Sequence, residues 1–114
     1  MKIDFIHKIK GFGHYPSEYR ICICTENNMT YICFIDLDIG VSVTNASEHL
    51  ATEIVGKLKL DPLYCRFFET YSYQNQETLD EIKYDWKKVG GDWVAVNPQW
   101  SFKTNDDIKK LFFT

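Results

Sequence analysis

The alternation of polar and apolar residues predicts a strand at the start of the chain. Ile3, Phe5, His7 and Ile9 alternate with Asp4, Lys8 and Lys10, with Ile6 as the one exception, and this period of two is typical of a half-buried strand. The segment 11–19 (GFGHYPSEY) holds two glycines and a proline among aromatic residues, so we expect an ordered loop there.

A strand hairpin is predicted next, in the stretch RICICTENNMTYICFIDLD. If Asn27-Asn28 is a two-residue turn, Cys22 lies opposite Cys33. Both faces of this hairpin are then apolar, with Ile21, Ile23, Ile32 and Phe34 on one side and Cys22, Cys24, Cys33 and Ile35 on the other. Such a hairpin is expected to be central in a sheet or covered on both faces.

The apolar spacing changes to three and four residues after position 45, which predicts an amphipathic helix from Ala46 to Leu58. Asn45 is a good N-cap, and Glu48 three residues later completes a variant of the capping box. The helix is expected to end before Asp61-Pro62 because the residue before a proline disfavours helical geometry.

Three more strands and a second helix are predicted in the remaining sequence. Segment 63–73 alternates and places Cys65, Phe67, Glu69, Tyr71 and Tyr73 on one face. Segment 78–89 alternates as well, Gly90-Gly91 fits a tight hairpin turn, and the strand after it is expected to end at Asn97-Pro98. Segment 104–113 has the N-cap, charge order and apolar stripe of a short helix.

The predicted fold is therefore α+β, a single domain over residues 1–114. We expect a mostly antiparallel sheet of about six strands with two helices, in the order β-β-β-α-β-β-β-α. With both helices on one face of the sheet, this is a two-layer sandwich.

Composition and charge limit the cellular compartments and the kinds of partner that we expect for this protein. The 114 residues have a net charge of −3 with scattered lysines and arginines, which argues against a nucleic-acid binder. No apolar run is long enough to span a bilayer, and the first residues do not resemble a signal peptide. The four cysteines lie in apolar strand-like segments, as reduced thiols do. We expect a cytoplasmic protein that does not bind membranes.

Two polar groups near the first helix could hold a ligand. Asp36 and Asp38 share one face of an extended chain and could bind a divalent metal. Thr44, Asn45 and Glu48, at the helix start, could instead line an anion site. A strand leaving the core and ordinary helix capping explain the same residues, so we expect no metal and no cofactor.

Glu69 is the carboxylate that the pattern places among aromatic side chains. A buried carboxylate is costly unless it is paired or hydrogen-bonded. Its partner could be a lysine, an arginine or a tyrosine hydroxyl, or Glu69 could act as an acid or base with a raised pKa. If the face is open instead, Glu69, Tyr71, Tyr73 and Trp86 line a groove.

Other candidate chemistry is weaker. Cys22, Cys24 and Cys33 share a face and could form a zinc site, although such strands usually only pack small apolar side chains. His14 with Tyr15 in the glycine-rich loop is the histidine that we expect to be exposed and functional, and His49 lies on the predicted helix. No motif for a nucleophile or a phosphate loop occurs.

The number of large aromatic residues favours binding over catalysis, since Tyr and Trp are preferred at interfaces. One hypothesis is a small interaction protein, such as an adaptor, inhibitor, immunity or antitoxin-like module of bacterial or phage origin. It would bind a protein partner, or a second copy as a homodimer, through an aromatic, mildly acidic surface of Glu69, Tyr71, Tyr73, Trp86, His14, Tyr15, Thr44 and Asn45. The alternative is a small-molecule-binding protein or hydrolase that uses Asp36, Asp38 and Glu69.

Overall fold

The computed structural model describes residues 2–10, 16–36, 46–70, 79–101 and 106–113 of the chain. Their elements are β1 (Lys2–Lys10), β2 (Pro16–Glu26), β3 (Met29–Asp36), α1 (Ala46–Leu58), the 3-10 helix η1 (Pro62–Tyr64), β4 (Cys65–Thr70), β5 (Asp80–Val89), β6 (Asp92–Ser101) and α2 (Asp106–Phe113). The α+β class predicted from the sequence is confirmed, and the sheet is mostly antiparallel.

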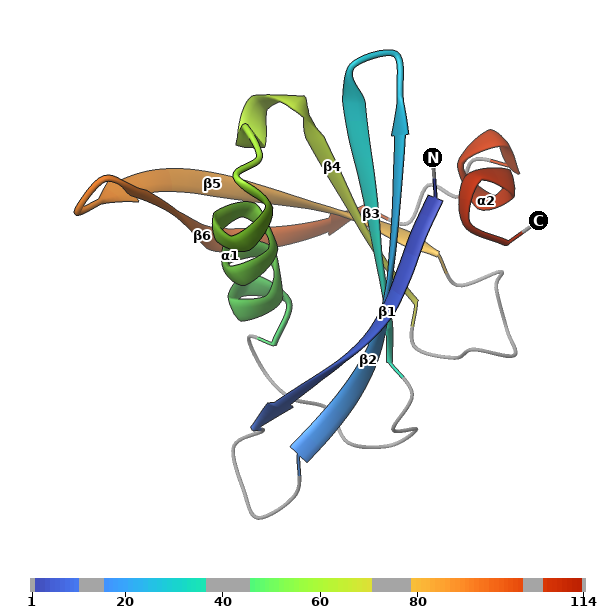
Figure 1. Cartoon of the computed structure of the whole chain (residues 1–114), viewed down its shortest axis with the longest axis horizontal. Coiled ribbons are helices and arrows are strands. Elements are labelled where there is room, and N and C mark those ends of the chain that lie inside the picture. Colours follow the sequence, from blue (N-terminus) through green and yellow to red (C-terminus); the bar gives the residue numbers. More distant parts are fainter. Residues whose placement is uncertain (1, 11–15, 37–45, 71–78, 102–105, 114) are drawn as a thin grey trace.

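The strands form one sheet in the order β1-β2-β3-β4-β5-β6. All neighbours are antiparallel except β3 and β4, which are parallel, so the sheet is mixed. Parallel neighbours need a crossover connection, and α1 provides it (Figure 1). The carboxyl ends of β3 and β4 therefore lie at the same end of the sheet.

The predicted register of the β2–β3 hairpin is confirmed. Cys22 pairs with Cys33, and Glu26 pairs with Met29. The turn residues Asn27 and Asn28 have φ values of 52° and 65°, as a two-residue hairpin turn with left-handed backbone requires. Asparagine tolerates this geometry better than most residues do.

The two-layer arrangement predicted from the sequence is wrong, because α1 and α2 lie on opposite faces of the sheet (Figure 1). On one face, α1 packs on Ile21, Ile32 and Phe34. On the other face, α2 packs on a cluster with Cys22, Cys33, Ile35 and Phe68. The apolar character of both faces of the hairpin is the reason, since each face needs its own cover.

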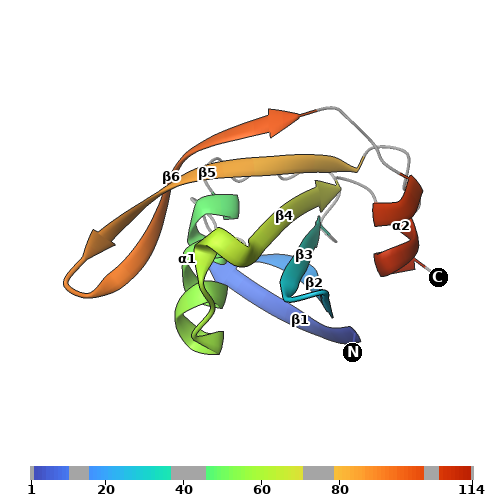
Figure 2. The same cartoon turned by 90° about the horizontal axis from the view of Figure 1, so that it is seen from above.

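Two boundaries of the later strands also differ from the prediction. Segment 62–64 forms η1, with Asp61 as N-cap accepting the Leu63 N–H at 3.0 Å, so β4 starts only at Cys65. Asn97-Pro98 does not end β6 but forms an irregularity, with Asn97 at φ 53° and a register shift opposite Lys83 and Asp85. A proline is tolerated there because β6 is an edge strand. The β5–β6 hairpin extends beyond α1 (Figure 2).

The helices agree with the predicted segments. α1 covers Ala46–Leu58 and ends with Lys59 at φ 52° and a 3.0 Å hydrogen bond from Leu60 N–H to the Val55 carbonyl, a left-handed C-terminal motif. In α2, Ile108 and Phe112 are buried. The proposed caps Asn45 and Thr104 lie outside the described residues. Within the described ranges, no helix is long and apolar enough to cross a membrane.

Candidate functional site

Most of the predicted site residues fall outside the part of the chain that the structure describes. These are His14, Tyr15, Asp38, Thr44, Asn45, Tyr71 and Tyr73. Asp36 is described through its backbone only, as the last residue of β3. The binding roles proposed for these residues therefore stay predictions.

Asp36 and Glu69 come to the same end of the sheet. Phe34 is in register with Glu69, and Ile35 with Thr70, so Glu69 lies near the carboxyl end of β4 and beside the end of β3. The Tyr84 hydroxyl donates a 3.2 Å hydrogen bond to the Ser47 carbonyl and so ties the first turn of α1 to β5. The hypothesis of a small-molecule-binding protein or hydrolase requires Asp36 and Glu69 to lie at the same end of the sheet. It remains a prediction.

Glu69 is buried, with 9% of its surface exposed. Its Oε2 accepts a 2.9 Å hydrogen bond from Trp100 Nε1. A charged acceptor makes such a bond stronger than a neutral one does. Sequence reasoning did not consider Trp100 as the partner, because it ended the last strand at Asn97-Pro98, whereas β6 continues and sets Trp100 opposite Ile82.

Tyr84 joins this polar group to the helix. Burial raises the pKa of the Tyr84 hydroxyl strongly, the charges of Glu69 and Glu48 raise it further, and the hydrogen bond to Ser47 opposes the shift. Tyr84 is therefore a neutral donor that fixes the first turn of α1 above the sheet. It is unsuited to act as a base at neutral pH.

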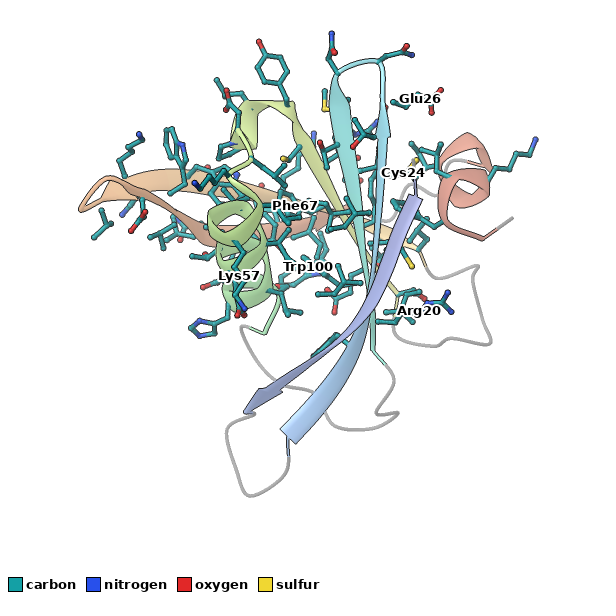
Figure 3. All side chains as sticks on the ribbon, viewed as in Figure 1. Arg20, Cys24, Glu26, Lys57, Phe67 and Trp100 are labelled. Atoms are coloured by element: carbon teal, nitrogen blue, oxygen red, sulfur yellow. The ribbon has the colours of Figure 1, made fainter. Side chains whose placement is uncertain are left out.

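The aromatic residues of β5 and β6 belong mainly to the core under α1. The ring of Phe67 lies 5.3 Å from that of Tyr84 and 5.7 Å from that of Trp86, and Phe67, labelled in Figure 3, belongs to the buried cluster that contains the apolar residues of α1. Trp93 is half-buried, with Lys88 Nζ 4.9 Å from its ring centre. Trp86 is thus a packing residue in this structure.

Asp80 lies directly opposite Glu69 in the β4–β5 pair and is 7% exposed. Within the described part of the chain its side chain makes no hydrogen bond or ion pair. Burial raises the pKa of its carboxyl group, since the charged form is desolvated.

We expect Asp80→Asn to stabilise the protein at pH 7 relative to the wild type, but not at pH 4. A pKa raised in the folded state favours folding below the unfolded value of about 3.9, and this contribution is lost as the pH rises through the folded value. Urea unfolding of both proteins at the two pH values measures the difference. An Asp80→Asn variant that is less stable than the wild type at pH 7 would contradict the expectation.

The cysteines show no sign of catalytic or metal chemistry in the described residues. Cys22 and Cys33 are buried thiols packed towards α2, and no group of three or more metal-ligating side chains occurs in the described ranges. The Cys65 thiol donates to the Asp61 carbonyl at 3.3 Å. Burial and then the charge of Asp61 raise the pKa of Cys65 to about 11, so it is a poor nucleophile.

A surface that sequence reasoning missed lies where α1 leads through η1 into β4. Three apolar side chains are exposed along this connection: Leu58 by 46%, Leu63 by 81% and Tyr64 by 56%. We call these three residues the corner patch. The alternating pattern predicts that Leu63 and Tyr64 begin a strand, but they lie in η1. The Asp61-Pro62 pair, which favours a turn, was the sequence feature that indicated this.

A hollow of about 440 Å³ adjoins the corner patch. It is lined by Asn28, Thr30, Lys59, Leu60, Asp61, Tyr64 and Cys65. These residues come from the β2–β3 turn, the start of β3, the end of α1, η1 and the first residue of β4. The hollow therefore lies at the opposite end of β3 and β4 from Glu69.

Comparisons of the chain with models of protein families, with curated proteins and with solved structures gave no match. Neither a family nor a related protein therefore suggests a function, and the corner patch and the Glu69 end of the sheet are judged on their geometry alone.

Proposed function

We propose that the protein is a small interaction module, of the adaptor, inhibitor, immunity or antitoxin-like kind, that binds a protein partner. The observation that carries the proposal is the corner patch. Leu63 exposes 81% of its surface, although removing apolar surface from water contributes roughly 25 cal/mol per Å². Exposed apolar groups that lie close together are typical of contact surfaces.

The proposed contact surface differs from the one expected from the sequence. Among the residues expected to form it, Glu69 is buried, and Trp86 is half-buried and packs against the core under α1; their binding roles stay predictions. The corner patch instead combines two leucines with a tyrosine, and tyrosine is enriched at interfaces. The cytoplasmic location and the bacterial or phage origin remain parts of the proposal.

Affinity capture from the native cell with three forms of the chain tests this proposal. We expect Leu63→Asp to reduce the recovery of a specific partner at least tenfold, because it places a charge in the apolar contact. Val89→Asp is the matched control, since Val89 is 60% exposed but lies at the end of the β5–β6 hairpin.

The partner must be recovered with the wild type and with Val89→Asp and lost with Leu63→Asp, while circular dichroism shows that all three forms are folded. Equal recovery of every captured protein with Leu63→Asp and the wild type would reject the corner patch as the contact surface.

A further inference from the structure

Four hydrogen-bond donors line the hollow beside the corner patch: the side chains of Asn28, Thr30, Lys59 and Tyr64. Within the part of the chain that the structure describes, none of these side chains makes a hydrogen bond or ion pair with another residue. Two other cations are paired: Lys57 with Glu53 at 2.7 Å and Arg66 with Glu81 at 2.9 Å. The hollow thus presents donors that internal contacts leave available.

The other two polar residues of the hollow, Asp61 and Cys65, each take part in internal hydrogen bonds. Asp61 accepts the Leu63 N–H through Oδ1, and the Cys65 thiol donates to the Asp61 carbonyl. Leu60 adds apolar surface to the wall, and Leu63 is exposed nearby. A group that binds here should therefore accept hydrogen bonds and carry an apolar neighbour.

The hollow carries one charge of each sign, so a single negative group beside Lys59 is favoured over a doubly charged one, which Asp61 repels more strongly. Among the described residues that line the hollow, Lys59 is the only basic one and Asp61 the only acidic one. One ammonium group can attract a carboxylate, and the neutral donors can satisfy both of its oxygens. A phosphate dianion would bring a second negative charge close to Asp61, which is unfavourable.

We propose that the hollow binds a carboxylate with an adjacent apolar group, as presented by an acidic and apolar segment of the protein partner. This proposal rests on the proposed function, because it takes the carboxylate to come from a protein partner. The volume of the hollow, about 440 Å³, lies in the range of sites for small ligands. The apolar part of the segment would then cover the corner patch.

Titration of the ¹⁵N-labelled chain with small probes, followed by NMR, tests the chemistry without the partner. Phenylacetate is expected to shift the amide signals of residues that line the hollow and to saturate. Phenylacetamide, which has the same shape but no charge, should bind at least fivefold more weakly, and inorganic phosphate should also bind more weakly. Equal binding of the amide, tighter binding of phosphate, or shifts away from the hollow would each overturn the proposal.

Lys59→Gln should weaken phenylacetate binding about tenfold, because it removes the cation and keeps a donor. Lys57→Gln is the control, since it makes the same charge change on an exposed lysine two residues earlier, in α1, that does not line the hollow. Thr30→Val provides a second test with a nearly isosteric change, and it should weaken binding by a smaller factor. Unchanged binding in both Lys59→Gln and Thr30→Val would overturn the proposal.

The partner experiment separates this inference from the proposed function. If Leu63→Asp loses the partner while Lys59→Gln retains it and phenylacetate does not bind, the interaction surface stands and the carboxylate site is rejected. If phenylacetate binds in the hollow but Leu63→Asp still captures every protein, the carboxylate site stands and the protein-docking role of the corner patch is rejected.

Discussion

Phe67→Ala is expected to lower the free energy of unfolding by about 3–5 kcal/mol, the cost of removing a buried phenylalanine from a packed core. Phe67 is 3% exposed and its ring lies 6.0 Å from Phe34, besides its contacts with Tyr84 and Trp86. It therefore joins the centre of the sheet to the β5–β6 hairpin under α1. Urea unfolding monitored by tryptophan fluorescence gives the value.

Leu63→Ala is the control for this prediction. It also removes a large apolar side chain, but Leu63 is 81% exposed, so we expect a change within about 0.5 kcal/mol. A loss below about 1 kcal/mol for Phe67→Ala would mean that α1 does not seal this face of the sheet. The strand face of Phe67 would then be open, as in the groove hypothesis for Glu69.

Local patterns predicted the central hairpin and α1 well. The register of Cys22 with Cys33 follows from the Asn27-Asn28 turn, since a two-residue turn fixes every pair beyond it. The bounds of α1 follow from its apolar stripe and from the Asp61-Pro62 pair. In these segments, neighbours along the chain determine the geometry.

The sequence did not indicate where each helix packs or how the edge strand ends. The side of the sheet that α2 covers depends on contacts with β2 that are distant in sequence. Asn97-Pro98 usually ends a strand, but at an edge the missing proline N–H costs little, so β6 continues to Trp100. The partner of Glu69 could be found only once that continuation was known.

The candidate sites, too, depend on contacts between residues that are distant in sequence. The convergence of Asp36 with Glu69 depends on the parallel pairing of β3 and β4, which no local pattern encodes. The corner patch and the hollow combine the β2–β3 turn with the end of α1 and with η1. Residues such as Asn28 and Lys59 have no distinctive motif around them, so only the fold brings their side chains together.

Trp100→Phe is expected to cost about 1.5–3 kcal/mol, the range for a lost hydrogen bond to a charged group. The substitution removes the indole N–H that Glu69 Oε2 accepts at 2.9 Å. Glu69 is 9% exposed, so water replaces the lost donor poorly. Trp100 itself is 40% exposed, and the smaller ring therefore costs little through lost burial.

Trp93→Phe makes the same chemical change on the same strand, at a half-buried ring, and should cost less than Trp100→Phe. Combining Trp100→Phe with Glu69→Leu isolates the pair, because the coupling energy of a double-mutant cycle reports the interaction between the two side chains. We expect a coupling of about 1 kcal/mol or more. A coupling near zero would show that the Trp100 hydrogen bond contributes nothing to stability.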